Sequence, residues 1–127
     1  MATKHTKITM NIVMILASVA LNALAQLLIR KGMLGIGEVG VSSLFSHIGA
    51  MITNLWLWLA MMSYAVSIFL WMSVLSKVEV SFAYPFLSIG YILAAVAGYM
   101  LFNEHLSLTR ILGIVVICVG VILISRS

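Results

Sequence analysis

The sequence predicts an all-α membrane protein with four transmembrane helices. Hydrophobic residues make up 64% of the chain and charged residues only 8%, which is not the composition of a soluble domain. The chain also contains four apolar runs, each close to the roughly 20 residues that a spanning helix needs. We expect the spans at residues 10–29, 55–76, 82–102 and 108–125, which together form a single transmembrane domain over residues 1–127.

The first expected helix, residues 10–29, follows a short segment that contains Lys4 and Lys7. Signal peptides also begin with a basic segment, but they end at a small-residue cleavage site after a short apolar core. Here the apolar run continues through two amide side chains, Asn22 and Gln26. We therefore expect a retained first helix.

This first helix carries a stripe of polar side chains. Four of them fall within about 80° of each other on a helix of 3.6 residues per turn: Asn11, Ser18, Asn22 and Gln26. Arg30 extends the same face by roughly 40°. Such side chains either hydrogen-bond to a neighbouring helix or line a groove that solvates a polar head group. We favour the groove, because the stripe runs nearly the whole helix and ends in a cation.

The one long connection, residues 30–54, contains five of the nine glycines. Apolar residues recur within it at helical spacing, opposite serine and histidine, which indicates a short amphipathic helix at the membrane surface. A long N-terminal extension of the second helix would give the same pattern. Trp56 and Trp58 then mark the boundary between water and lipid, where amphipathic rings prefer to lie.

The second expected helix, residues 55–76, presents Tyr64 and Trp71 on one face. Their spacing suits either an aromatic wall for an amphiphile or packing against lipid and the protein core. The links to the third helix and from the third to the fourth are very short. We therefore expect the second, third and fourth helices to be antiparallel neighbours.

The third expected helix, residues 82–102, repeats the polar face with Tyr84, Ser88 and Tyr91. Pro85 lacks an N–H group, so the helix is expected to bend near it. Small residues predict surfaces for close helix packing on the third and fourth helices: Gly90, Ala94, Gly98, Gly113 and Gly120.

The chain offers little for catalysis or metal binding. Its three carboxylates, Glu38, Glu79 and Glu104, all lie outside the expected spans. The histidines lack metal-ligand spacing, and no nucleophile–base pair is evident. We expect no enzymatic activity, no catalytic residue, no metal and no cofactor. The net charge of +4 comes from helix ends, which indicates contact with lipid phosphates rather than with nucleic acid.

Three segments of the chain resemble the small multidrug resistance superfamily: Val80–Ser88, Asn103–Ser107 and Leu112–Val121. The resemblance covers all four helices and implies the bundle of that superfamily. The form Ala-Tyr-Pro-x-Leu-Ser at residues 83–88, with Ala-Gln-Leu at residues 25–27, is most similar to subunits of the undecaprenyl-phosphate aminoarabinose flippase.

The resemblance implies a transporter that flips a polyprenyl-phosphate-linked sugar across the bacterial inner membrane for lipid A modification. It also implies a dimer, either a homodimer or a heterodimer with a homologous subunit. The partners would then be the lipid-linked sugar or polyprenyl phosphate, membrane lipids and that second chain.

One position departs from the drug exporters of the superfamily. Those exporters carry a glutamate in the middle of the first helix, which binds cation and proton alternately. Alignment on Arg30 places Asn22 at that glutamate, and an amide cannot titrate. The tryptophan that drug exporters keep on the third helix falls at Leu87, whereas their tyrosine is retained as Tyr84.

An amide stripe that ends in arginine suits an anionic amphiphile, because the guanidinium fork matches phosphate oxygens. The resulting predicted substrate-binding residues are Asn22, Gln26, Arg30, Tyr64, Tyr84, Ser88 and Tyr91. Two other functions stay open. One is a proton-coupled exporter of cationic compounds, and the other is a membrane subunit that scaffolds a partner without transporting.

Overall fold

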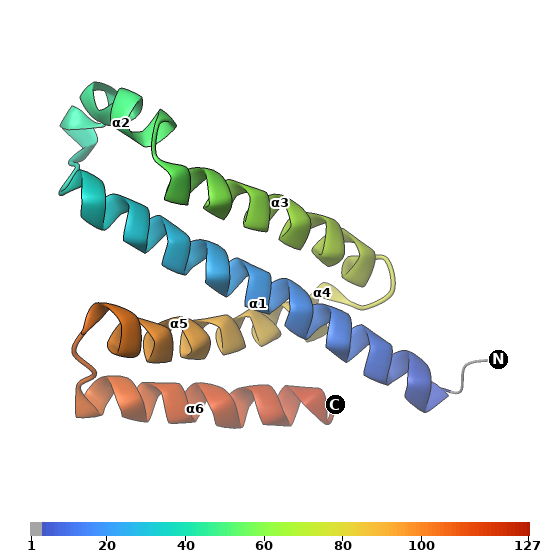
Figure 1. Cartoon of the computed structure of the whole chain (residues 1–127). Helices are drawn as coiled ribbons and strands as arrows, with labels where there is room; N and C mark the ends of the chain where they lie inside the picture. The colour runs from blue at the N-terminus through green and yellow to red at the C-terminus, as the bar shows by residue number, and fades with distance from the viewer. Residues whose placement is uncertain (1–3) are drawn as a thin grey trace.

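The computed structural model describes residues 4–127, and their side chains from Thr9 onward. In this part of the chain, four helices are long and apolar enough to cross a membrane: Thr9–Ile36, Leu55–Leu75, Val80–Phe102 and Leu108–Ser125. The protein is thus an all-α, multi-pass membrane protein, as the sequence predicts. Figure 1 shows the start of the first helix, the end of the last helix and the link between the second and third spans at the same end of the bundle.

Helix α1, Lys4–Ile36, is longer than the sequence pattern suggests. The helix continues through Arg30, which therefore projects from a rigid element and not from a loop. It ends where Gly37 adopts a left-handed conformation with φ of +100°, and the Gly37 N–H bonds to the Met33 carbonyl at 2.8 Å. Glycine is the residue that adopts this conformation without a steric penalty.

Helix α1 lies between two other helices (Figure 1). Helix α3, Leu55–Leu75, packs along one side of α1, and helix α5, Leu87–Phe102, packs against another side. Helix α6, Leu108–Ser125, packs on α5. The expectation that the second and third helices are neighbours is wrong, because α1 separates α3 from α5. The short link between them instead passes to α4, Val80–Ala83, at one end of the bundle.

The connection before α3 forms three short helical turns: η1 at Val41–Ser43, η2 at Phe45–His47 and α2 at Ile48–Ile52. Thr53 and Asn54 separate these turns from α3. The amphipathic segment is therefore distinct from the second helix and does not extend it. Asn54 begins α3, since its side-chain oxygen accepts from the Trp56 and Leu57 N–H groups at 3.0 and 3.3 Å.

Pro85 interrupts the third span as the sequence predicts. Helix α4 ends at Ala83, a 3₁₀ turn η3 covers Tyr84–Phe86, and α5 begins at Leu87. Phe86 in this turn is buried in a core that also contains residues of α1, α3 and α4. The core residues are Ile15, Val19, Val74, Ala83 and Phe86.

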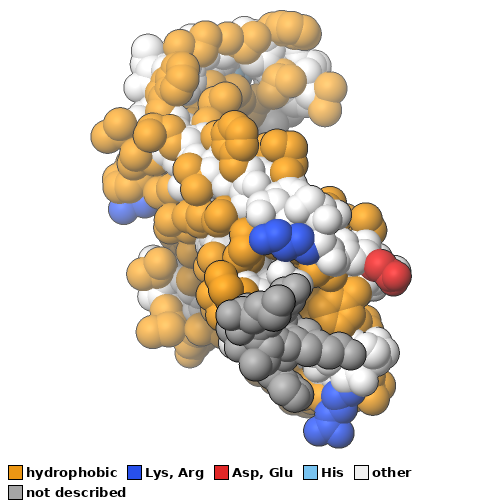
Figure 2. All heavy atoms as spheres, turned by 90° about the vertical axis from the view of Figure 1, so that its right-hand side faces the viewer, with side chains coloured by type: hydrophobic (Ala, Val, Ile, Leu, Met, Phe, Trp, Pro, Cys, Tyr) orange, Lys and Arg blue, Asp and Glu red, His pale blue; other side chains and the backbone are white. Residues whose placement is uncertain are grey.

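Helix α6 has no buried residue, although it is the most apolar of the four spans. Hydrophobic side chains are likewise widespread among the described atoms of the face seen in Figure 2, with few charged groups among them. A soluble protein would bury such a helix, whereas lipid or a second chain can cover it in a membrane.

Candidate functional site

A cavity of about 380 Å³ lies between the middle of α1 and the first half of α5. Two of the three amides of the predicted stripe, Asn22 and Gln26, line it together with Tyr91 from α5. The other lining residues are small or apolar: Val19, Ala23, Leu87, Gly90 and Ala94. Gly90 and Ala94 leave the space that larger side chains would fill. The structure therefore places Asn22, Gln26 and Tyr91 around one hollow with polar groups on an otherwise apolar wall.

Gln26 also connects this cavity to α3. Its side-chain Nε2 donates a hydrogen bond to the Tyr64 hydroxyl. Tyr64 is half-buried and does not line the cavity itself, so its hydrogen bond orients the Gln26 side chain from α3, outside the cavity. The Gln26 amide keeps its oxygen and its second N–H for a ligand, because a primary amide has two donors and one acceptor atom.

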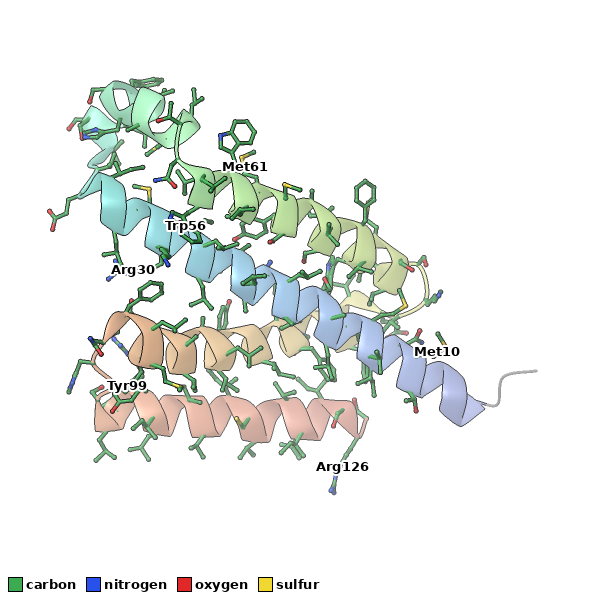
Figure 3. The ribbon with its side chains drawn as sticks, viewed as in Figure 1. Met10, Arg30, Trp56, Met61, Tyr99 and Arg126 are labelled. Atoms are coloured by element: carbon green, nitrogen blue, oxygen red, sulfur yellow. The ribbon has the colours of Figure 1, made fainter. Side chains whose placement is uncertain are left out.

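Arg30 lies one turn further along α1, in a second cavity of about 150 Å³. The two cavities share Gln26 and Ala94, so they adjoin along the seam between α1 and α5. Figure 3 shows the Arg30 side chain extending from α1 toward the last turn of α5. There its Nε lies 3.0 Å from Oε1 of Glu104, a residue of the loop that follows α5.

The Arg30–Glu104 ion pair is accessible. The arginine side chain is 52% exposed and the glutamate side chain 36% exposed. Exposed pairs contribute little to stability, commonly between zero and about 1 kcal/mol. The pair therefore places two opposite charges at the mouth of a polar seam, where a ligand can reach both of them.

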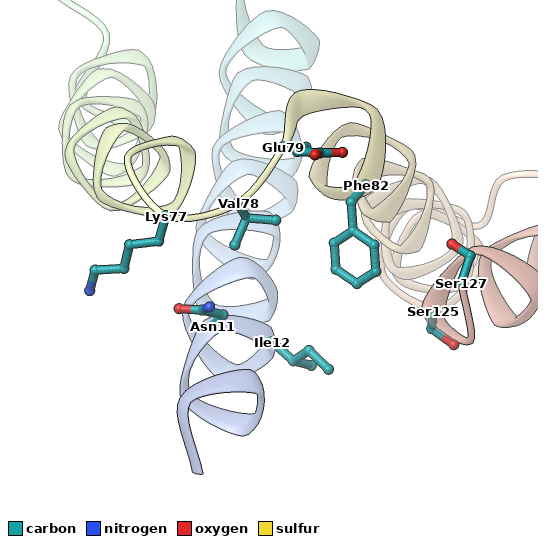
Figure 4. Close-up of a pocket in the computed structure, with 8 residues that line it drawn as sticks. All are labelled: Asn11, Ile12, Lys77, Val78, Glu79, Phe82, Ser125 and Ser127. Carbon is teal, nitrogen blue, oxygen red and sulfur yellow. The ribbon is translucent and has the colours of Figure 1, made fainter. Parts of the chain in front are cut away.

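The remaining residues of the predicted stripe have other places. Ser18 is buried and hydrogen-bonds to Ser67 on α3, so it holds two helices together and does not line the cavity. Asn11 lines a separate cavity of about 370 Å³ near the C-terminus, with Lys77, Glu79 and Phe82 (Figure 4). Thus only the middle and end of the stripe face the seam between α1 and α5.

Two predicted binding residues lie elsewhere on the third span. Tyr84 is 61% exposed in the turn before α5, and neither it nor half-buried Ser88 lines either seam cavity. A role for Tyr84 and Ser88 in binding remains a prediction.

The predicted packing residues divide between two surfaces. An added Cβ at Gly90 would lie 3.3 Å from a Val19 methyl carbon, so Gly90 packs against α1 in the same chain. Gly98 lies beneath the carboxylate of Glu104. Apart from the adjacent residues and the nearby backbone of α6 itself, no described atom lies within 4 Å of the Cβ position of Gly113 or Gly120. Those two glycines are free to pack against another chain.

The sequence reasoning missed Glu104. This residue lies 74 positions from Arg30 in a loop, and no local spacing connects the two. The sequence offers only a weak hint in Gly98, since a glycine near the end of an apolar helix permits another group to approach closely.

Comparison with known proteins connects this chain to one family. A family model described as Small Multidrug Resistance protein matches residues 31–117. No solved structure gave a significant match to the chain.

Curated relatives give more specific names. A protein of Pseudomonas savastanoi pv. phaseolicola is 30% identical over 113 residues, covering 89% of this chain and 95% of the relative. One of Pseudomonas fluorescens is 35% identical over 71 residues, covering 56% of this chain and 62% of the relative. One of Hamiltonella defensa is 38% identical over 74 residues, covering 58% of this chain and 67% of the relative. Each is named "Probable 4-amino-4-deoxy-L-arabinose-phosphoundecaprenol flippase subunit ArnE".

Proposed function

Because the chain belongs to the small multidrug resistance family, we propose that it is a transporter subunit that flips a polyprenyl-phosphate-linked amino sugar across the bacterial inner membrane. The observation that carries this proposal is the seam between α1 and α5, in which the amide-lined cavity adjoins the cavity of Arg30. The names of the curated relatives support the choice of cargo. Such a protein moves its cargo without changing it, so we propose a transporter and not an enzyme.

The chemistry of the seam fits the parts of such a cargo. The amides of Asn22 and Gln26 can hydrogen-bond to sugar hydroxyls, and Arg30 can bind phosphate oxygens. The polyprenyl tail stays in lipid alongside the bundle. A head group that slides along these side chains avoids exposing its charge to bare hydrocarbon, which costs several kcal/mol at least.

A proton-coupled exporter of cations is less well supported by the same cavity. The eight residues that line the larger seam cavity include no carboxylate. An exporter of that kind needs an ionisable group at which proton and cation compete. Asn22 lines the cavity instead, and its amide stays neutral at every physiological pH.

We further propose that a homologous subunit completes the site. The larger cavity is lined by α1 and α5 alone, and α6 exposes an apolar surface with two glycines that lack neighbours among the described residues. Small residues of this kind permit close approach of helices in membranes. A second copy or a homologous chain could then enclose the head group.

Transport by purified protein in proteoliposomes tests the proposal. A fluorescent short-chain polyprenyl-phosphate aminoarabinose should move between leaflets in the presence of the wild type. Arg30→Ala should reduce the rate at least tenfold, since loss of a charged hydrogen-bond partner costs about 1.5–3 kcal/mol. Arg126→Ala, which removes an exposed arginine outside both cavities, should retain the wild-type rate. Full transport by Arg30→Ala would exclude Arg30 from the mechanism.

A further inference from the structure

The Arg30–Glu104 pair has unused binding capacity on both sides. Nε is the only side-chain atom of Arg30 that hydrogen-bonds to a described residue, and it donates to Oε1 of Glu104. A guanidinium has five N–H donors, so four of them are available. The second carboxylate oxygen of Glu104, Oε2, likewise accepts no hydrogen bond from the part of the chain that the structure describes. Both groups line the smaller seam cavity.

We propose that Glu104 determines the specificity of this site by binding the ammonium group of a zwitterionic head group, while Arg30 binds the phosphate of the same molecule. This inference rests on the proposed function, and it narrows the cargo to lipid-linked sugars that carry an amine. The relatives are named for such a cargo, a 4-amino sugar on a phosphate. Their names do not say which residue recognises the amine.

The charges explain why the amine matters. A phosphate that binds Arg30 comes close to the Glu104 carboxylate, and two like charges repel. A cargo without an amine must bear that repulsion or displace the carboxylate from Arg30. A cargo with an ammonium group gives Oε2 a partner, so all four charges alternate in sign. The pair should therefore favour the amino sugar over its hydroxyl analogue.

The position of Glu104 is built into the chain. Asn103 ends α5 in a left-handed conformation with φ of +53°, and the Glu104 N–H then bonds to the Gly98 carbonyl at 3.2 Å. The carboxylate folds back over Gly98, where an added Cβ would lie 2.6 Å from Oε2. On the other side of the residue, Arg110 donates to the His105 carbonyl at 2.8 Å. Glu104 is thus held above the seam by the turn and the absence of a side chain at Gly98.

The test compares two ligands that differ in one group. Short-chain polyprenyl-phosphate arabinose bearing a 4-amino or a 4-hydroxyl group is titrated into the purified full chain in nanodiscs, with tryptophan fluorescence as the readout. The wild type should bind the amino ligand about tenfold more tightly, the size expected for one charged hydrogen bond. Glu104→Gln should reduce this preference to less than about threefold, chiefly by lowering the affinity for the amino ligand.

Two further variants separate the possible outcomes. Glu38→Gln makes the same change at an exposed glutamate outside both seam cavities and should keep the full preference. Arg30→Ala should lower the affinity for both ligands. An undiminished preference in Glu104→Gln overturns the role of Glu104 while leaving the proposed function intact, as does equal binding of both ligands by the wild type. Failure of the wild type to bind either ligand overturns the proposed function together with this inference.

Discussion

The hydroxyl groups of Ser18 on α1 and Ser67 on α3 each donate a hydrogen bond to the other residue's backbone carbonyl at 3.0 Å. Both residues are at least 96% buried. The two bonds fix α1 against α3 in rotation and in height. They thereby determine which face of α1 remains for α5, and with it the placement of Asn22 and Gln26 at the seam.

Replacing Ser67 by alanine should destabilise the bundle by about 1 kcal/mol. Interhelical hydrogen bonds in membranes average about 0.6 kcal/mol and reach about 1.7, and this change removes one donor from a reciprocal pair. The free energy of unfolding, measured by titrating a denaturing detergent into mixed micelles, checks this value. Ser63→Ala is the matched control, because the Ser63 hydroxyl bonds to Leu59 of its own helix. An equal decrease in unfolding free energy in the two variants would contradict an interhelical role of the Ser67 hydroxyl.

Asn54 should contribute through two separate bonds. Its oxygen caps α3, and its Nδ2 donates to the Gly32 carbonyl of α1 at 3.2 Å. Asn54→Ala removes both and should cost about 1–2 kcal/mol. Asn54→Asp keeps the cap but cannot donate to Gly32. The unfolding free energy of this variant should therefore lie between those of Asn54→Ala and the wild type. Full recovery with aspartate would mean that the Gly32 contact contributes nothing.

Much of the fold is readable from residue type and local spacing. The apolar runs define the four spans, and the missing N–H of Pro85 predicts the break before α5. The polar stripe on α1 is also a local pattern, and the amides at its centre do face α5. Local spacing does not predict that the stripe is shared between two neighbouring helices. Ser18 faces α3 and Asn22 faces the cavity beside α5, because a face about 80° wide meets two different helices.

What the sequence could not predict depends on tertiary packing. Short links suggested that the second and third helices are neighbours, but α1 fits between α3 and α5 because the link reaches across one end of the bundle. The pairing of Arg30 with Glu104 similarly requires the helix ends to meet in space. No pattern of residue spacing in the sequence indicates either relationship.

Gly98→Ala should separate the ion pair without unfolding the helix. The added methyl group would lie 2.6 Å from Oε2, at the far end of a flexible side chain, so Glu104 can move aside. Alanine also favours a helix over glycine by up to about 1 kcal/mol, which offsets the lost contact. We expect an unfolding free energy within about 1 kcal/mol of wild type and the same loss of amine preference as in Glu104→Gln.

The control for this change is Gly113→Ala, since no described atom lies within 4 Å of that Cβ position apart from the adjacent residues and the nearby backbone of α6 itself. It should leave the ligand preference of the isolated chain unaltered. Combining Gly98→Ala with Glu104→Gln should add nothing to the effect of either one on amine preference, because both act on the same carboxylate. Additive effects would show that Gly98 influences binding by another route.

Asn22→Asp tests whether the neutrality of the cavity selects the cargo. The two side chains have nearly the same shape, so the variant adds a negative charge to the cavity wall with little change in packing. Repulsion in a site of low dielectric constant should lower the affinity for an anionic polyprenyl phosphate on the order of tenfold at neutral pH. The same charge should strengthen binding of a lipophilic cation such as tetraphenylphosphonium. Asn11→Asp, at the other cavity, should do neither, and unchanged affinities in Asn22→Asp would remove this amide from the site.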